Sequence, residues 1–476
     1  MNHSAAATEI NRRSWLKAAG LLGSASLVGS SAAFAGTTPD NPRNKRVRGI
    51  VFMVSDGMSP GVLTLANHWS LLQRKRETRW WQLLNDKNAA RGLMDTASAN
   101  SIVTDSAAAS SSWGGGQRIN NSAINFSPDG KEITPIAAIL KNQSKAKVGL
   151  VTTATVTHAT PAGFASAVPV RSAQADIAPQ YLDRVDVILG GGTPFFSAHG
   201  RPDKRNLNAD FAKAGYRVVH HRNDMLAARD EKLLGTFSKG HLPFSIDRLA
   251  SPKLTARIPT LSEMASAALD RFLPGDTPFL LQVEGARIDH AAHLNDIGGL
   301  LGDQLDFDDA LATVLDRIAG RDDILVVVTS DHGNANPGLR GMGATYADTN
   351  QHFATIANSN ASYERTLAEW RNLPQRNPSS LTQLIADRLG IQLTSVESEA
   401  LFDVLGGHEI LEWNHQHQNP EGLIGQIIGN HNGIGWTGIS HTSDPTIVSA
   451  IGPESQRFSG MVINTDVFKH LTELLA

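Results

Sequence analysis

The sequence predicts an α/β protein with a doubly wound, mostly parallel central sheet, helices on both faces and an inserted cap region. Apolar runs of strand length alternate with helical patterns along most of the 476 residues, as expected for a parallel sheet. Two of these runs, residues 279–283 and 324–330, end on acidic and histidine side chains. Ligands of open α/β sheets bind beyond the carboxyl ends of the strands, so these two ends predict a functional site.

Five apolar runs are expected to form the core of this sheet. Each is rich in Val, Ile or Leu, as buried parallel strands are. They cover residues 48–55, 148–153, 185–189, 279–283 and 324–330. Helices are expected between them, for example over 261–272 and 303–319, where apolar residues recur with helical spacing.

One stretch, residues of about 334–430, departs from the strand and helix alternation. It begins with Asn, Gly and Pro and continues with amphipathic helical patterns. We interpret it as an insertion or cap beside the site. The rest of residues 36–476 is expected to form one catalytic domain, because α/β chains of this length can share a single core.

The first 35 residues have the features of an export signal. Arg12 and Arg13 form a twin-arginine start, a weakly apolar run follows over 18–28, and small residues offer a cleavage point after Ala35. The alternative is a membrane anchor, but this run is shorter than the roughly 20 residues that a spanning helix needs. The sequence therefore predicts a periplasmic or secreted protein exported by the twin-arginine machinery, with no membrane span in the mature chain.

Composition excludes some classes of function. The chain has no cysteine, so an exported form has no disulfides and relies on its core, and on any bound metal, for stability. Hydrophobic residues at 41% and charged residues at 19% are typical of a globular protein. A formal net charge of -3 provides no basic field, and nucleic-acid binding is not expected.

A candidate nucleophile, Ser106, lies at the expected start of an Ala-rich helix over 106–110. A helix N-terminus presents free N–H groups and a partial positive charge, which would stabilise a phosphoryl group while the hydroxyl attacked it. The alternative is a serine that only caps the helix. The surrounding residues lack the Gly-x-Ser-x-Gly pattern, which argues against a serine-hydrolase triad.

Candidate metal ligands follow the strands. Asp289 and His293 are four residues apart, one helical turn, so both can reach one cation. Asp331 and His332 follow the 324–330 strand, and Asp56 follows the first strand. Any one of these is more often a surface carboxylate or a hydrogen-bonded histidine. Together, at several strand ends, they favour metal ligation.

Six separated blocks of the sequence resemble the alkaline phosphatase family, and they occur in the family's order. The resemblance extends over most of the chain after the export signal and is weakest in the insertion. The blocks are Asp56-Gly57-Met58, Thr104-Asp105-Ser106-Ala107, Thr157 to Pro161, Glu284 to His293, Ser330-Asp331-His332, and Gly435-Trp436-Thr437 with His441-Thr442.

The resemblance implies hydrolysis of phosphate monoesters by Ser106 through a phosphoserine intermediate. It also implies two zinc ions that serve the attacking and leaving oxygens, and a third site, usually for magnesium. Arg171, thirteen residues after His158, has the position of the phosphate-binding arginine, whose fork matches two phosphate oxygens. The implied metal ligands are Asp56, Asp331 and His332 for one zinc, Asp289, His293 and His441 for the second, and Asp56, Thr160 and Glu284 for the third ion.

Two positions near the third site, His158 and His290, vary within the family, where other members carry acidic or lysine residues. Histidine there leaves the identity of the third metal open. His415 and His417 in the insertion are expected to be solvated loop residues. The sequence assigns no role to the other histidines, which include His241.

Alternatives to a monoesterase are a phosphodiesterase or sulfatase on the same scaffold, and a non-catalytic periplasmic binder of metal or phosphate. A binder has no need of Ser106, which favours an enzyme. Third-site ligands Thr160 and Glu284 favour monoesters, because related two-metal diesterases generally lack that site. The expected partners are small phosphate monoesters, and the resemblance makes a homodimer one candidate assembly.

Overall fold

The computed structural model describes residues 46–408, 414 and 419–476. The predicted export signal, His415 and His417 lie outside the described residues. No helix in the described part of the chain combines the length and apolar character needed to cross a bilayer.

The central feature is a ten-stranded sheet with the strand order β14-β2-β13-β8-β1-β7-β3-β4-β6-β5. Among these strands only β13 runs antiparallel to its neighbours, which confirms the predicted mostly parallel sheet. The strands are β1 Gly49–Val54, β2 Ala90–Asp95, β3 Lys147–Thr155, β4 Val187–Gly191, β5 Tyr216–Val219, β6 Lys232–Thr236, β7 Phe279–Glu284, β8 Ile324–Thr329, β13 Thr446–Ile451 and β14 Gly460–Ile463.

The strands at the middle of the sheet are buried on both faces. Every residue of β1, β7 and β8 is buried. Successive side chains of β1 point to opposite faces, so Val51 and Met53 pack into one hydrophobic cluster while Ile50 and Phe52 pack into the other. Burial on both faces explains why these strands read as continuous apolar runs in the sequence.

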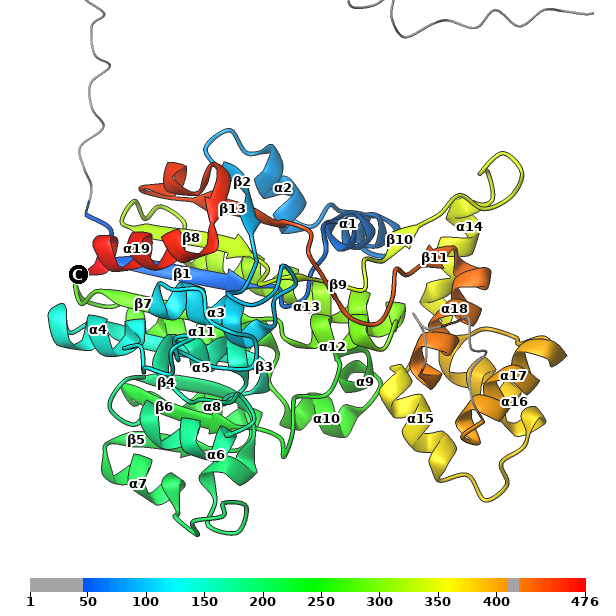
Figure 1. The fold of residues 1–476 in the computed structure, drawn as a ribbon, viewed down its shortest axis with the longest axis horizontal. Coiled ribbons are helices and arrows are strands. Elements are labelled where there is room, and N and C mark those ends of the chain that lie inside the picture. The colour runs from blue at the N-terminus through cyan, green and yellow to red at the C-terminus, as the bar shows by residue number, and fades with distance from the viewer. Residues whose placement is uncertain (1–45, 409–413, 415–418) are drawn as a thin grey trace, which may run out of the picture. The chain divides into compact units, whose positions relative to one another are not determined.

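Helices cover both faces of the sheet, as predicted (Figure 1). One cluster takes its helical residues mainly from α1, α2, α11, α12 and α13, and the other from α3, α4, α5, α7 and α19. The bounds of these helices are α1 Pro60–Arg74, α2 Arg79–Asn85, α3 Ser106–Gly115, α4 Ile136–Gln143, α5 Ala159–Ala165, α7 Leu207–Lys213, α11 Leu261–Phe272, α12 Arg287–His293, α13 Ile297–Arg317 and α19 Asn464–Leu475. Shorter helices are α6 Gln174–Ile177, α8 Arg222–Ala227, α9 Ser245–Leu249 and α10 Pro252–Arg257.

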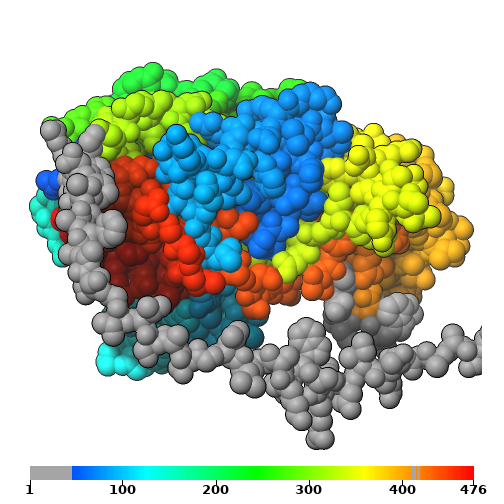
Figure 2. All heavy atoms as spheres, turned by 90° about the horizontal axis from the view of Figure 1, so that it is seen from above, coloured from blue at the N-terminus to red at the C-terminus, as the bar shows by residue number. Residues whose placement is uncertain are grey.

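The inserted segment is a group of helices with its own hydrophobic cluster, which includes Leu367, Trp370 and Leu384. Figure 1 shows these helices in yellow and orange beside the sheet. Figure 2 shows them next to α1 in blue, where Trp69 meets Phe353 edge-on with ring centroids 5.7 Å apart. The helices are α14 Thr349–Ala354, α15 Tyr363–Arg371, α16 Pro378–Leu389, α17 Ser395–Leu405 and α18 Pro420–Asn432.

Short antiparallel pairings join the start of the inserted segment to the chain that follows it. β10 Gly338–Leu339 pairs with β11 Ile434–Gly435, and β9 Gly333–Asn334 pairs with β12 His441–Thr442. The second pairing matters for function, because it brings His441 next to the end of β8 although more than a hundred residues separate them in the sequence.

Candidate functional site

Three neighbouring strands end at the same level and deliver most of the candidate ligands. In the sheet, Val54 of β1 lies opposite both Glu284 of β7 and Thr329 of β8. Asp56 follows β1 by two residues, and Asp331 follows β8 by two. Parallel strands in this register place their carboxyl ends side by side, so the acidic residues that follow them converge.

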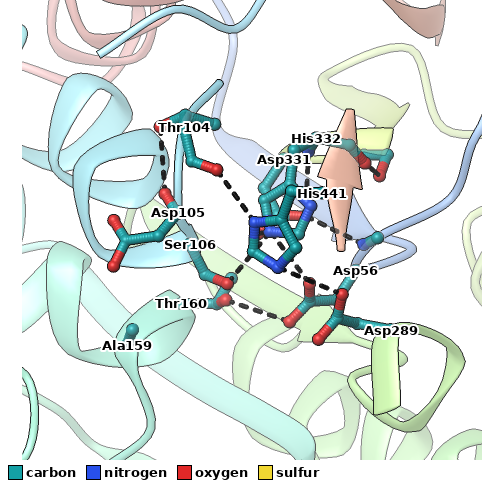
Figure 3. Close-up of polar contacts among 12 residues, drawn as sticks. Asp56, Thr104, Asp105, Ser106, Ala159, Thr160, Asp289, Asp331, His332 and His441 are labelled. Carbon is teal, nitrogen blue, oxygen red and sulfur yellow. Dashed lines mark hydrogen bonds and ion pairs between the residues drawn. The ribbon is translucent and has the colours of Figure 1, made fainter. Parts of the chain in front are cut away.

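Ser106 is the first residue of α3, and its side chain points into the site (Figure 3). Its hydroxyl Oγ lies 3.1 Å from Nε2 of His332. The residue that caps the helix is Asp105, whose carboxylate accepts a hydrogen bond of 2.9 Å from the Ala108 amide. The interpretation of Ser106 as the helix cap is therefore wrong, and its buried hydroxyl contacts His332 instead.

The first ligand group consists of Asp56, Asp331 and His332, all buried. Nε2 of His332 lies 3.2 Å from Asp331 Oδ2 and 3.7 Å from Asp56 Oδ1. These two carboxylate oxygens accept no hydrogen bond. The group adjoins Ser106, and its unpaired oxygens and imidazole nitrogen suit a cation.

The second group consists of Asp289, His293 and His441. The histidines come from α12 and β12, and their Nε2 atoms lie 3.1 Å apart and 3.4 and 3.6 Å from the Asp289 carboxylate. Nδ1 of His293 and Nδ1 of His441 each donate at 2.8 Å to a backbone carbonyl. A carbonyl only accepts, so each Nδ1 carries a proton, and each Nε2 is the ring atom that faces the Asp289 carboxylate.

The predicted third site is formed by Asp56, Thr160 and Glu284. The Thr160 hydroxyl lies 3.4 Å from Asp56 Oδ2, and Glu284 accepts a 2.5 Å hydrogen bond from the Thr152 hydroxyl. The other carboxylate oxygen of Glu284 is buried and accepts no hydrogen bond. A ring nitrogen of His158 lies within 4.8 Å of the carboxylate oxygens of Asp56 and Glu284.

The four carboxylates of the site are Asp56, Glu284, Asp289 and Asp331, each at most 4% exposed. None forms an ion pair with a lysine or arginine in the described part of the chain. Burial, followed by the charge of Asp331, raises the pKa of Asp56 well above its usual value, and burial raises the pKa of Glu284 to about 7. Buried carboxylates gathered in this way need positive charge. The residues therefore fit metal ions.

Arg171 lies beside the nucleophile. One guanidinium nitrogen, Nη1, donates at 3.0 Å to Asp105, the residue before Ser106, and the other, Nη2, donates at 3.1 Å to Nε2 of His158. The backbone amide of Arg171 donates at 2.7 Å to the Ser122 carbonyl, which anchors the loop. The structure thus brings the predicted phosphate-binding arginine to the same site.

One site residue, His241, was not predicted. It follows β6, and its ring lies 4.4 Å from that of His290 and 5.6 Å from that of His158, measured between centroids. Its Nδ1 accepts a hydrogen bond of 3.2 Å from the Thr155 amide. The sequence offers no signal for His241, because no other candidate ligand lies near it in the sequence. The residues that surround it in space come from β3, the start of α5, and α12. We call His158, His241 and His290 the histidine trio.

Hydrogen bonds fix the protonation of the trio. Each ring has one nitrogen that accepts from a group that can only donate, namely Arg171, the Thr155 amide or Arg287. The proton must therefore lie on the other ring nitrogen, and each ring is neutral. Burial is the main cause that lowers the pKa of all three, to about 4 for His241. The trio presents N–H donors, in contrast to the metal-facing histidines.

Comparisons with known proteins agree with this geometry. A family model for alkaline phosphatase matches residues 47–476. Alkaline phosphatase 3 of Bacillus subtilis is 30% identical over 475 residues, covering 94% of this chain and 95% of that protein. Streptomycin-6-phosphate phosphatase of Streptomyces griseus is 33% identical over 374 residues, covering 68% of this chain and 82% of that protein. The crystal structure of Thermus thermophilus alkaline phosphatase has a TM-score of 0.83 and 32% identity, covering 90% of this chain and 91% of that one. The chain therefore belongs to the alkaline phosphatase family.

Proposed function

We propose that this chain hydrolyses phosphate monoesters through a phosphoserine at Ser106. Family membership supports the phosphomonoesterase activity. The observation that carries the finer proposal is the Ser106 hydroxyl at the start of α3, 3.1 Å from a histidine that forms a metal-ligand group with Asp56 and Asp331. A hydroxyl held in this position can attack a phosphorus atom bound at the helix N-terminus.

The chain's own groups divide the work of the reaction. Ser106 supplies the attacking oxygen, and the free amides at the start of α3 face the phosphoryl group. Arg171 binds two of the phosphate oxygens with its guanidinium fork, for which it must exchange contacts with Asp105 or His158. Attack of the Ser106 oxygen on phosphorus breaks the ester P–O bond, and the alcohol leaves with a proton. Water then attacks the phosphoserine, releases inorganic phosphate and restores the Ser106 hydroxyl, so the net reaction is hydrolysis of the ester.

Two sets of ligands suit zinc and one suits magnesium. Asp56, Asp331 and His332, and Asp289, His293 and His441, combine carboxylate and imidazole donors, which zinc prefers. Asp56, Thr160 and Glu284 offer oxygen donors, which magnesium prefers. When bound, these ions supply Lewis-acid stabilisation of the attacking and leaving oxygens.

His158 bears on the choice of the third metal. While its Nε2 accepts from Arg171, its Nδ1 carries the proton and has no lone pair to offer an ion. The buried Nδ1 of His158 has no hydrogen-bond partner among the described residues, whereas Asp56, Thr160 and Glu284 supply oxygen ligands for the third ion. This supports magnesium at that position.

Replacing Ser106 tests the mechanism. Ser106→Ala is expected to lower the turnover of an aryl phosphate by about a thousandfold or more, because it removes the hydroxyl on which the covalent intermediate forms. Metal content by elemental analysis should stay that of the wild type, because the ligand groups are intact. A Ser112→Ala variant, on the same helix but bonded to the Ala108 carbonyl, is the control. Wild-type turnover in Ser106→Ala would refute the phosphoserine route.

We also propose export through the twin-arginine pathway, on the basis of Arg12 and Arg13 in the first 35 residues. Replacing both arginines with lysine should keep the enzyme in the cytoplasm of a bacterial host. Fractionation and a phosphatase assay of each compartment measure this. Periplasmic activity in that variant would refute the proposed route.

A further inference from the structure

Arg287 links the site helix α12 to the inserted segment. Its side chain is buried, and its guanidinium lies over the ring of Phe244, 3.7 Å from the centroid. Nη1 donates at 2.9 Å to Nδ1 of His290, and Nη2 forms a 2.6 Å ion pair with Glu364 of α15. The two ends of one rigid guanidinium plane thus hold a residue of the site and a residue of the inserted segment.

The contacts continue from His290 to the phosphate-binding arginine. The ring of His290 lies against those of His241 and His158, with centroid distances of 4.4 and 5.7 Å. His158 in turn accepts the 3.1 Å hydrogen bond from Arg171. A chain of direct contacts therefore runs from Glu364 through Arg287 and the histidine trio to Arg171.

The start of α15 is fixed firmly enough to act as an anchor. The Ser362 amide and hydroxyl donate to the carboxylate of Asp247 at 2.9 and 2.6 Å, and the Tyr363 amide donates at 2.8 Å to Asp296. Both carboxylates are buried. Figure 1 shows α15 beside α9, which carries Asp247. Glu364 is the next residue, so its backbone position is determined by these bonds, although its side chain is 61% exposed.

We propose that Glu364 is a positioning residue that acts from the inserted segment on phosphate binding by Arg171. Glu364 neutralises and orients Arg287, which holds His290 and through it the trio that contacts Arg171. The inference rests on the proposed function, because it assigns the phosphate-binding role to Arg171. Through Glu364, the inserted segment influences the affinity of the site for phosphate.

The physical reason is the buried charge of Arg287. Without Glu364, the guanidinium loses its only ion pair in the described residues while its Nε already lacks a partner. A buried cation without a counterion turns toward water or another acceptor. His290 then loses the donor that fixes its ring, and the packing of the trio loosens against the guanidinium of Arg171.

The test compares two glutamates of the same helix. Glu364→Ala removes the ion pair to Arg287, whereas Glu369→Ala removes ion pairs to Arg365 and Arg388 that stay within the inserted segment. Glu364→Gln keeps an acceptor oxygen but no charge. For each metal-loaded variant, KM and kcat for an aryl phosphate, the Kd of inorganic phosphate by calorimetry, metal content and melting temperature are measured.

We expect Glu364→Ala to raise KM and the phosphate Kd by about three- to tenfold, with kcat changed by about twofold at most and metal content unchanged. Glu364→Gln should fall between the wild type and Glu364→Ala. Glu369→Ala should match the wild type in KM and Kd, even if its melting temperature falls. A purely structural role of Glu364 would lower the melting temperature without moving KM or Kd.

Equal phosphate Kd values for Glu364→Ala, Glu369→Ala and the wild type would overturn the inference. A double-mutant cycle adds a second criterion: in an Arg287→Met background, Glu364→Ala should have no further effect on Kd. The single variants decide the inference if that background is insoluble. A wild type that hydrolyses no monoester would instead overturn the proposed function, while the phosphate Kd values would still decide the inference.

Discussion

Six histidines at the site form two sets that differ in what their ring nitrogens bond to. His293, His332 and His441 turn Nδ1 toward backbone carbonyls and present Nε2 to the carboxylates. In the trio, a group that can only donate occupies one ring nitrogen, so that nitrogen accepts and the proton lies on the other. The first set places Nε2 beside carboxylates, and the second set is held neutral by donors. The hydrogen-bond partner outside the site therefore determines what each imidazole can bind.

The two sets of histidines also differ in the charged groups that surround them. Burial acts to lower the pKa of His293, but the charge of Asp289 and hydrogen bonds to Asp289 and the Ile439 carbonyl together outweigh it, and the pKa rises to about 9. At His290, burial and the charge of Arg287 act together and lower the pKa well below its usual value. His441 is the exception in its set, because burial and the charge of His332 lower its pKa to about 4. Carboxylates thus surround one set and arginines the other.

Removing the metal ions should have the largest effect. Four buried carboxylates lose their counterions on chelation, so we expect loss of nearly all phosphatase activity and a lower melting temperature. An ion present at about a thousand times its Kd contributes about 4 kcal/mol of stability. Activity and melting temperature before and after dialysis against a chelator measure this, and zinc with magnesium should restore both. Full activity after verified metal removal would contradict the metal-ligand assignment.

Variants of two histidines on one helix test whether the two sets differ in function. His293 and His290 both lie on α12, three residues apart, but belong to different sets. His293→Ala should lose about one metal ion per chain and lower kcat/KM by about 100-fold or more, because a ligand is gone. His290→Ala should keep its metal and lose about tenfold at most, mainly in KM. Equal metal loss in both variants would show that the two sets do not differ in function.

The sequence predicted the middle of the sheet and missed its edges. Strands β1, β7 and β8 are buried on both faces and so are apolar throughout. β2 alternates buried and exposed residues over only six positions, and β14 has four residues of which three are exposed, so neither gives a continuous apolar run. Helix α13 begins at Ile297, six residues before the predicted start, because Asp296 caps it across a Gly-Gly pair.

The candidate ligands could be predicted because each follows a strand or lies one helical turn from another ligand. Asp56 and Asp331 show this directly in the sequence. The place of His241 in the site could not be predicted, because its ring contacts that of His290 only when the loop after β6 packs against β3. The sequence also left the protonation of His158 and His290 open, since that depends on arginines placed by tertiary contacts. Ligand roles and the domain boundary of the insertion stay predictions.

The smallest expected effect is a pH dependence of stability from His241. Burial, with the charge of Arg287, lowers its pKa to about 4 in the folded chain, from 6.5 for an exposed imidazole. The unfolded chain therefore binds more protons between those values, and stability falls as the pH falls from 6.5 toward 4. Between pH 6.5 and 5 the loss is at most about 2 kcal/mol, at about 1.36 kcal/mol per pH unit.

His241→Asn isolates this effect, because its amide oxygen can still accept from the Thr155 amide but cannot titrate. Melting temperatures of the metal-free wild type and variant are compared at pH 7 and pH 5, so that metal release at low pH does not enter. The wild type should lose a few degrees more than the variant over this interval. Identical losses would mean that His241 binds its proton at the same pH in the folded and unfolded chains, and would contradict its lowered pKa in the folded chain.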